Sequence, residues 1–200
     1  MDRLVPDQLA LFESQRSEPE GLRFAADFIS PAIEQKLILG VQGLPLQPFQ
    51  FGQFEGKRRV ASFGFRYDYA LRQLQAADPL PSWLVEIVAE VETFGGPGIR
   101  IQQVLCTEYA IGVGIGWHRD KPHFDKVFGL SLGSACRLRF RRPAGKTWER
   151  FGLDAEARSL YMMSGASRQV WEHSIPPVEA PRYSITFRTM SNGPDRKTFA

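Results

Sequence analysis

The sequence is poor in the residues that build disulfide frameworks and zinc clusters. It has two cysteines among 200 residues, Cys106 and Cys136, and they do not share the CxxC spacing of zinc sites. A disulfide-rich scaffold and a cysteine-based metal site are therefore excluded. In a chain long enough to bury its own core, we expect both thiols to be small buried hydrophobic groups.

Long apolar runs and a strong charge of one sign are also missing. No segment approaches the ~18 apolar residues that a membrane-spanning helix needs. The first residues carry an acid at Asp2 and lack the apolar core of a secretory signal. We therefore expect an intracellular, cytoplasmic protein with no membrane attachment. The formal net charge is only +3, which permits a nucleic-acid partner without requiring one.

The remaining composition is that of a packed globular domain. Hydrophobic residues make up 43% of the chain and charged residues 24%, a balance that excludes a disordered protein. There are no internal repeats, low-complexity blocks or long linkers. We expect a flexible arm over residues 1–22, where polar residues dominate, followed by a single domain over residues 23–200, and we expect a monomer.

The chain places its helices early and its strands late. A short helix is predicted over residues 31–39, with Ser30 as N-cap and Gly40 as C-cap. A second helix is predicted over residues 81–94, where apolar residues recur at helical spacing. From Ile99 onward, short runs of alternating polarity predict antiparallel strands. This order favours an α+β fold with a β-sandwich or jelly-roll core.

Histidine is rare, and two of the three histidines stand in informative contexts. On a strand, residues i and i+2 share a face, so His118 and Asp120 present an imidazole and a carboxylate to the same point. A second imidazole would complete the 2-His-1-carboxylate face that binds Fe(II) and leaves positions open for a co-substrate and O₂. His173 is the candidate in a strand-like segment, whereas His123 follows Pro122 in a predicted loop. The alternative is a hydrogen-bonded histidine with Asp120 as its salt-bridge partner.

The last predicted strand has one apolar and one wholly polar face. Its residues alternate between Arg182, Ser184, Thr186 and Arg188 on one face and Tyr183, Ile185 and Phe187 on the other. The Cα atoms of the two arginines would lie roughly 20 Å apart, and side chains that lean inward would leave a gap suited to a short dicarboxylate. Arginine grips carboxylates bidentately, and the hydroxyls between the arginines can donate hydrogen bonds. The alternative is the solvated outer face of an edge strand.

Taken in order, the His118-x-Asp120 pair, His173 and the closing arginines resemble the AlkB family of Fe(II)- and 2-oxoglutarate-dependent dioxygenases. The closing Arg-x-Ser-x-Thr-Phe-Arg is similar to the family's Arg-x-Asn-x-Thr-Phe-Arg signature. The resemblance covers roughly residues 99–190 and, more weakly, residues 51–70. It implies a double-stranded β-helix, or jelly-roll, core with N-terminal scaffold helices. It also implies that the two histidines and Asp120 hold the iron.

The resemblance assigns further roles around the co-substrate. Arg182 would bind the far carboxylate of 2-oxoglutarate, Arg188 would lie near its metal-chelating end and Asp120, and Tyr109 would contact it through the hydroxyl. The remaining expected co-substrate contacts are Thr107, Ser184 and Thr186. Two positions depart from the family pattern, because Thr107 stands where many members have asparagine and Pro122 replaces an acid that some members use against the target base.

The implied substrate is an N-alkylated base in DNA or RNA, with residues 51–70 as a recognition lid. Aromatic residues occupy alternate positions from Phe63 to Tyr69, and a row of rings can stack extruded bases. Phe65 and Tyr67 are the expected pocket residues. Positive charges that could hold phosphates come just upstream from Lys57, Arg58 and Arg59. The alternative is that the rings form the core face of a strand.

A second basic stripe is predicted on a later strand. Its outward residues are expected to be Arg137, Arg139 and Arg141, and its inward residues Cys136, Leu138 and Phe140. Such a stripe suits a polyanion, although any exposed strand can carry one. Lys121, beside the metal motif, is expected at the mouth of the site. Glu172 precedes His173 and should point to the opposite face, which leaves no residue in an acid–base role.

These features favour an oxidative demethylase of alkylated DNA or RNA that uses Fe(II), 2-oxoglutarate and O₂. Its products would be formaldehyde, succinate and CO₂, and the protein would supply positioning rather than acid–base catalysis. One alternative is a 2-oxoglutarate-dependent hydroxylase of a protein or small molecule, which would share the metal and co-substrate residues. Another is a non-catalytic β-sandwich that binds nucleic acid through its arginine stripe.

Overall fold

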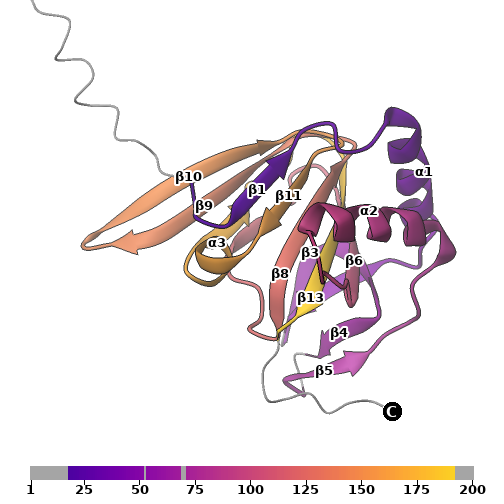
Figure 1. The fold of residues 1–200 in the computed structure, drawn as a ribbon, viewed down its shortest axis with the longest axis horizontal. Helices are drawn as coiled ribbons and strands as arrows, with labels where there is room; N and C mark the ends of the chain where they lie inside the picture. Colours follow the sequence, from indigo (N-terminus) through magenta and orange to yellow (C-terminus); the bar gives the residue numbers. More distant parts are fainter. Residues whose placement is uncertain (1–17, 52, 69–70, 192–200) are drawn as a thin grey trace, which may run out of the picture.

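Two antiparallel sheets form the core of the structure, a computed structural model that describes residues 18–51, 53–68 and 71–191 (Figure 1). The strands of the seven-stranded sheet, in spatial order, are β1 (Leu22–Ala25), β11 (Leu160–Met163), β8 (Phe124–Leu132), β13 (Arg182–Met190), β6 (Gln103–Tyr109), β3 (Phe54–Phe63) and β2 (Gln47–Phe51). Those of the four-stranded sheet are β10 (Thr147–Ala155), β9 (Cys136–Ala144), β12 (Glu172–Ile175) and β7 (Ile115–His118). A separate hairpin pairs β4 (Phe65–Asp68) with β5 (Gln73–Ala76).

The two large sheets share a buried core between them. Val127 and Met163 of the seven-stranded sheet pack in one cluster with Leu138 and Phe140 of the four-stranded sheet. The chain is thus a jelly-roll of the predicted α+β class. No helix among the described residues is long and apolar enough to cross a membrane.

The helices cover the outer face of the seven-stranded sheet (Figure 1). They are α1 (Pro31–Gln42) and α2 (Val85–Gly95), which follows a 3-10 turn, η2 (Ser82–Leu84); a short α3 (Gly165–Gln169) links β11 to β12. Leu37 and Val91 from the helices pack with Ile185 and Phe187 of β13. Since these β13 residues face the helices, the alternate residues of β13 face the space between the sheets.

The N-terminal arm predicted over residues 1–22 falls mostly outside the described residues, which begin at residue 18. Leu22 is buried and pairs with Met163 at the start of β1. The Ser164 hydroxyl donates to the Gly21 carbonyl at 2.9 Å. Residues 21 and 22 are therefore joined to the edge of the seven-stranded sheet.

Both cysteines are buried and free, as predicted. Cys106 lies in the core under the helices and Cys136 in the core between the sheets. Burial raises the pKa of the Cys106 thiol to about 12, so this group behaves as a small apolar side chain.

The start of α1 was predicted correctly, but its end was not. The Ser30 hydroxyl accepts a hydrogen bond from the Ile33 amide at 3.3 Å, as an N-cap should. The predicted C-cap at Gly40 is wrong, because the helix continues to Gln42 and its cap is Gly43. Gly40 serves packing instead, since a Cβ there would lie 2.7 Å from the Trp83 ring.

Substitution of the two α1 glycines is expected to give opposite effects. Alanine in a helix interior is ordinarily about 1 kcal/mol more stable than glycine, but Gly40→Ala should lower the free energy of unfolding by about 1–3 kcal/mol because the methyl group collides with Trp83. Gly43→Ala should be neutral or slightly stabilising, because Gly43 has φ −76° and its nearest non-neighbouring atom is 3.5 Å from a built Cβ. Urea unfolding of the two variants checks this, and a stabilised Gly40→Ala would contradict it.

Candidate metal and co-substrate site

One group of three side chains among the described residues could hold a metal ion. His118 ends β7 and pairs across the sheet with His173 of β12, so the two rings lie with centroids 4.2 Å apart. Asp120 follows two residues after His118. One potential ligand atom from each of the three lies within 4.8 Å of the others. The structure therefore brings together the three residues predicted as metal ligands.

Both imidazoles are prepared to act as ligands. The Nδ1 of His118 lies 2.9 Å from the Gly116 carbonyl, so Nδ1 donates to this carbonyl and Nε2 is the nitrogen available to a metal. Burial, with a contribution from the neighbouring His118, lowers the pKa of His173 to about 3. His173 is therefore neutral at physiological pH, the form in which histidine binds metals.

Asp120 is held by Arg188 so that one carboxylate oxygen remains for a metal. Arg188 reaches Asp120 Oδ1 through Nε at 3.0 Å and Nη2 at 2.8 Å, and its Nη1 donates to Gln103 Oε1 at 2.7 Å. Asp120 Oδ2 lies 3.6 Å from His173 Nε2. Burial raises the pKa of the Asp120 carboxyl, but the charge of Arg188, with smaller contributions from its other neighbours, outweighs burial, so this pKa lies well below its usual range. Two imidazoles and one carboxylate are the donor set of a non-haem Fe(II) site.

A small cavity runs from this triad along β13. Its lining includes the side chains predicted to contact a co-substrate, namely Tyr109, Thr107, Arg182, Ser184, Thr186 and Arg188. Thr107 and Ser184 are neighbours across β6 and β13, and the Arg182 guanidinium carbon lies 5.0 Å from the centre of the Tyr109 ring. The polar face of β13 is therefore buried around a cavity and is not a solvated outer face.

Arg182 carries the strongest sign of an anion site. Its side chain is 1% exposed, and its Nη2 donates to Ser131 Oγ at 3.2 Å. Its Nε and Nη1 are buried without a hydrogen-bond partner among the described residues. A buried guanidinium with unused donors is costly, and a carboxylate in the cavity would accept hydrogen bonds from it. The residues present therefore fit a dicarboxylate with one end at Arg182 and the other at the metal triad.

Two positioning side chains had no distinct signal in the sequence. Arg168 of α3 is 5% exposed and donates through Nη2 to the carbonyls of Lys121 at 2.6 Å and Phe124 at 3.0 Å, which fixes the loop after Asp120. Tyr161 of β11 lines the same small cavity as Arg182. Tyr161 reaches the cavity because it pairs with Gly129, a neighbour that only the sheet register reveals.

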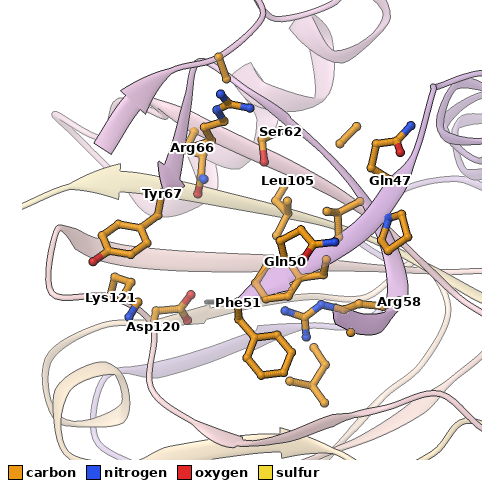
Figure 2. Close-up of a pocket in the computed structure, with 18 of the residues that line it drawn as sticks. Gln47, Gln50, Phe51, Arg58, Ser62, Arg66, Tyr67, Leu105, Asp120 and Lys121 are labelled. Carbon is orange, nitrogen blue, oxygen red and sulfur yellow. The ribbon is translucent and has the colours of Figure 1, made fainter. Parts of the chain in front are cut away.

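A larger open cleft of about 1430 Å³ adjoins the triad. His118, Asp120 and Arg188 form part of its floor, and β2, β3 and β4 supply much of its wall. In Figure 2, Tyr67 and Lys121 stand beside Asp120 on one side of the cleft, and Arg58 and Phe51 lie on the other. The predicted substrate residues Lys57, Arg58, Tyr67 and Lys121 all line the cleft.

The cleft combines aromatic rings with cations. The Lys121 ammonium lies 4.8 Å from the centre of the Tyr67 ring, and the His123 ring stacks on Tyr67 with centroids 5.6 Å apart and planes 30° apart. Across the cleft, the Arg58 guanidinium lies 3.9 Å from the Phe49 ring centre. Such pairs hold a positive charge against an aromatic face.

Two of the substrate residues predicted in the 51–70 segment do not line the cleft. Phe65 is absent from its lining because the strand predicted through this segment is broken at Gly64, which has φ +75° and donates its amide to the Asp78 carbonyl at 2.8 Å. Arg59 pairs with Glu108 at 3.2 Å and donates to the Leu46 carbonyl at 3.1 Å. Phe65 therefore lies outside the cleft lining, and Arg59 is engaged by a neighbouring strand and loop.

The basic stripe on β9 alternates as predicted, with Leu138 and Phe140 buried and the arginines on the outer face. Arg137 pairs with Asp154, and Arg139 donates to Ser174 Oγ at 3.1 Å.

Arg141 of the same stripe contacts one acidic side chain and two aromatic rings. It pairs with Glu172 at 2.7 Å and lies between Trp117 and Trp148, 4.4 and 4.3 Å from their ring centres. Glu172 thus points away from the triad, as expected. Acidic partners on Arg137 and Arg141 make the stripe less cationic than the sequence alone indicates.

Comparison with known proteins adds the family context. The sequence profile of the 2OG-Fe(II) oxygenase superfamily matches residues 25–188. The chain is 29% identical over 193 residues to the alkylated DNA repair protein ALKBH8 homolog of Arabidopsis thaliana, covering 84% of this chain and 54% of that protein. It is 32% identical over 166 residues to the tRNA (carboxymethyluridine(34)-5-O)-methyltransferase ALKBH8 of Mus musculus, covering 80% of this chain and 24% of the mouse protein. The chain therefore spans about half of the first relative and about a quarter of the second.

Solved structures share the fold at low sequence identity. OsALKBH1 has a TM-score of 0.68 at 16% identity, covering 86% of this chain and 98% of that chain. A Pseudomonas putida prolyl-4-hydroxylase has a TM-score of 0.64 at 14% identity, covering 86% of this chain and 93% of that chain. The shared fold does not identify the substrate, so any argument about the substrate must come from the cleft.

Proposed function

The chain belongs to the 2OG-Fe(II) oxygenase superfamily as an AlkB-like dioxygenase that uses Fe(II), 2-oxoglutarate and O₂, and from this premise we propose that it removes alkyl groups from the nitrogens of bases in DNA or RNA. In this proposal, His118, Asp120 and His173 hold the iron. The superfamily membership sets aside the hypothesis of a non-catalytic β-sandwich.

Each residue around the cavity has a binding or positioning task. Arg188 keeps Asp120 ionised and turned toward the imidazoles. The Arg182 guanidinium, which has unused donors, takes the distal carboxylate of 2-oxoglutarate, and the cavity hydroxyls donate further hydrogen bonds; they belong to Tyr109, Thr107, Ser184 and Thr186. When bound, the iron with 2-oxoglutarate and O₂ supplies the oxidation of a substrate C–H bond. An N-linked hydroxymethyl product then releases formaldehyde, and 2-oxoglutarate becomes succinate and CO₂.

The cleft surface supports a nucleic-acid base as the substrate. Tyr67 and Lys121 lie on the cleft wall next to Asp120 (Figure 2), which is where a base taken out of its stack would need a ring and a positive charge. Arg58 and Lys57 supply further cations on the opposite wall for the phosphates that flank such a base. The aromatic rings and cations that line the cleft beside the metal triad are the observation that carries the proposal.

The proposal is tested by assaying formaldehyde release from methylated single- and double-stranded oligonucleotides. Tyr67→Ala should raise the KM for the oligonucleotide about 5- to 150-fold, because base stacking on an aromatic ring contributes ~1–3 kcal/mol. Turnover of 2-oxoglutarate without a substrate should stay unchanged. Phe65→Ala, on the same strand but outside the cleft lining, is the matched control and should leave the KM unchanged.

The second candidate is a 2-oxoglutarate-dependent hydroxylase of a protein or small molecule. The shared fold with a prolyl-4-hydroxylase favours it, since the metal and co-substrate residues would be the same. Metal-dependent 2-oxoglutarate turnover with no formaldehyde from any methylated oligonucleotide would support this candidate and overturn the demethylase.

A further inference from the structure

The side chain of Tyr161 on β11 lies over the neighbouring strand β8 of the seven-stranded sheet. Tyr161 on β11 pairs with Gly129 on β8, and Gly129 pairs in turn with Thr186 on β13. A Cβ at Gly129 would overlap both the ring carbon Cζ and the hydroxyl of Tyr161. The missing side chain therefore lets the ring lie over β8, which carries the hydroxyl toward β13 and the co-substrate cavity that it lines.

Tyr161 is buried, and its hydroxyl is a hydrogen-bond donor without an acceptor among the described residues. The residue is 8% exposed and makes no hydrogen bond with the described residues. Burial raises the pKa of its phenol above the ordinary value, with the nearby Arg182 charge acting in the opposite direction. The group therefore keeps its proton and can only gain by donating it to an acceptor that enters the cavity.

The unused donors of Arg182 line the same cavity. Arg182 offers Nε and Nη1, both buried without a partner among the described residues. Thr107 and Ser184, which stand where the AlkB pattern has asparagine, are shorter than an amide side chain and leave space there. The Tyr161 phenol belongs to β11, which is separated from β6 by β8 and β13 in the sheet. The phenol therefore lies on the side of the cavity opposite β6.

We infer that Tyr161 is a further co-substrate-binding residue, whose hydroxyl donates a hydrogen bond to the carboxylate that Arg182 binds. Gly129 is the positioning residue that admits the ring. The inference rests on the assignment of Arg182 to 2-oxoglutarate and is independent of what the open cleft accepts.

The test is calorimetric binding of 2-oxoglutarate to the Mn(II)-loaded protein without O₂ or any nucleic acid. Tyr161→Phe should weaken binding of 2-oxoglutarate by about 10- to 100-fold, the usual effect of a hydrogen bond to a charged group. It should leave binding of 2-oxobutyrate unchanged, because that oxo-acid lacks the distal carboxylate. Tyr183→Phe is the matched control, since its hydroxyl accepts from Gln42 at 2.9 Å outside the cavity, and it should bind both oxo-acids as the wild type does.

Gly129→Ala provides a second route to the same effect. The added methyl group must displace the Tyr161 ring, so binding of 2-oxoglutarate should fall at least as far as in Tyr161→Phe. Wild-type affinity of Tyr161→Phe for 2-oxoglutarate would overturn the inference. An equal loss for both oxo-acids would also overturn it, because that pattern indicates a structural role. A failure of the nucleic-acid proposal would leave these results unchanged, because no nucleic acid is present.

Discussion

Replacement of Asp120 by alanine is expected to reduce Fe(II)-dependent conversion of 2-oxoglutarate to the level of the metal-free protein. The substitution removes the only carboxylate of the metal group found among the described residues. It also leaves the Arg188 guanidinium, whose side chain is 12% exposed, without its ionic partner, which should destabilise the fold by about 3–5 kcal/mol. Succinate formation measures the first effect and urea unfolding the second.

His118→Ala separates metal loss from the uncompensated charge. His118 does not pair with Arg188, so this variant should lose turnover as completely as Asp120→Ala while keeping most of its stability. Asp125→Ala is the matched control, because Asp125 is 43% exposed and its one ion pair among the described residues is with the neighbouring Lys126, and it should retain turnover. Undiminished turnover in either metal-ligand variant would refute the assignment.

Replacement of Arg182 by methionine is expected to weaken 2-oxoglutarate binding by roughly 30- to 4000-fold. The range follows from the 2–5 kcal/mol that loss of one partner of a buried charge pair typically costs. Unlike most losses of a buried arginine, this one should not destabilise the metal-free protein. Nε and Nη1 have no partner among the described residues, so an apolar side chain of similar length avoids the desolvation of an unpaired charge.

Arg182→Met should therefore weaken 2-oxoglutarate binding without lowering the stability of the ligand-free protein. Binding of 2-oxoglutarate falls, and the free energy of unfolding without ligand stays constant or rises. Arg137→Met is the control, since its exposed ion pair with Asp154 should contribute little to either quantity. A variant that binds 2-oxoglutarate normally, or one that unfolds in the absence of ligand, would contradict the role assigned to Arg182.

Local periodicity was sufficient to predict which side chains lie together at the triad and along the polar face of β13. The two-residue spacing of His118 and Asp120 and the alternation of β13 both follow from strand geometry. Confinement of His123 to a turn left His173 as the second imidazole. Each of these features depends on a few consecutive residues, which is the range over which a single sequence is informative.

The errors arose where distant neighbours decide the local structure. Gly40 stays within α1 because of its contact with Trp83, and Gly64 breaks the aromatic strand through its bond to Asp78. The arginines of β9 lose much of their free charge to acids on β10 and β12. Tyr161 enters the co-substrate cavity only because β11 pairs with β8. None of these pairings has a signal within its own segment.

The most direct test is a crystal structure of the protein grown with Mn(II) and 2-oxoglutarate in the absence of O₂. The metal and co-substrate assignments predict an anomalous peak in contact with His118 Nε2, Asp120 Oδ2 and His173 Nε2, chelated by the oxo-acid, with the far carboxylate on the guanidinium of Arg182. A metal bound elsewhere, or a diacid that leaves Arg182 unpaired, would contradict it.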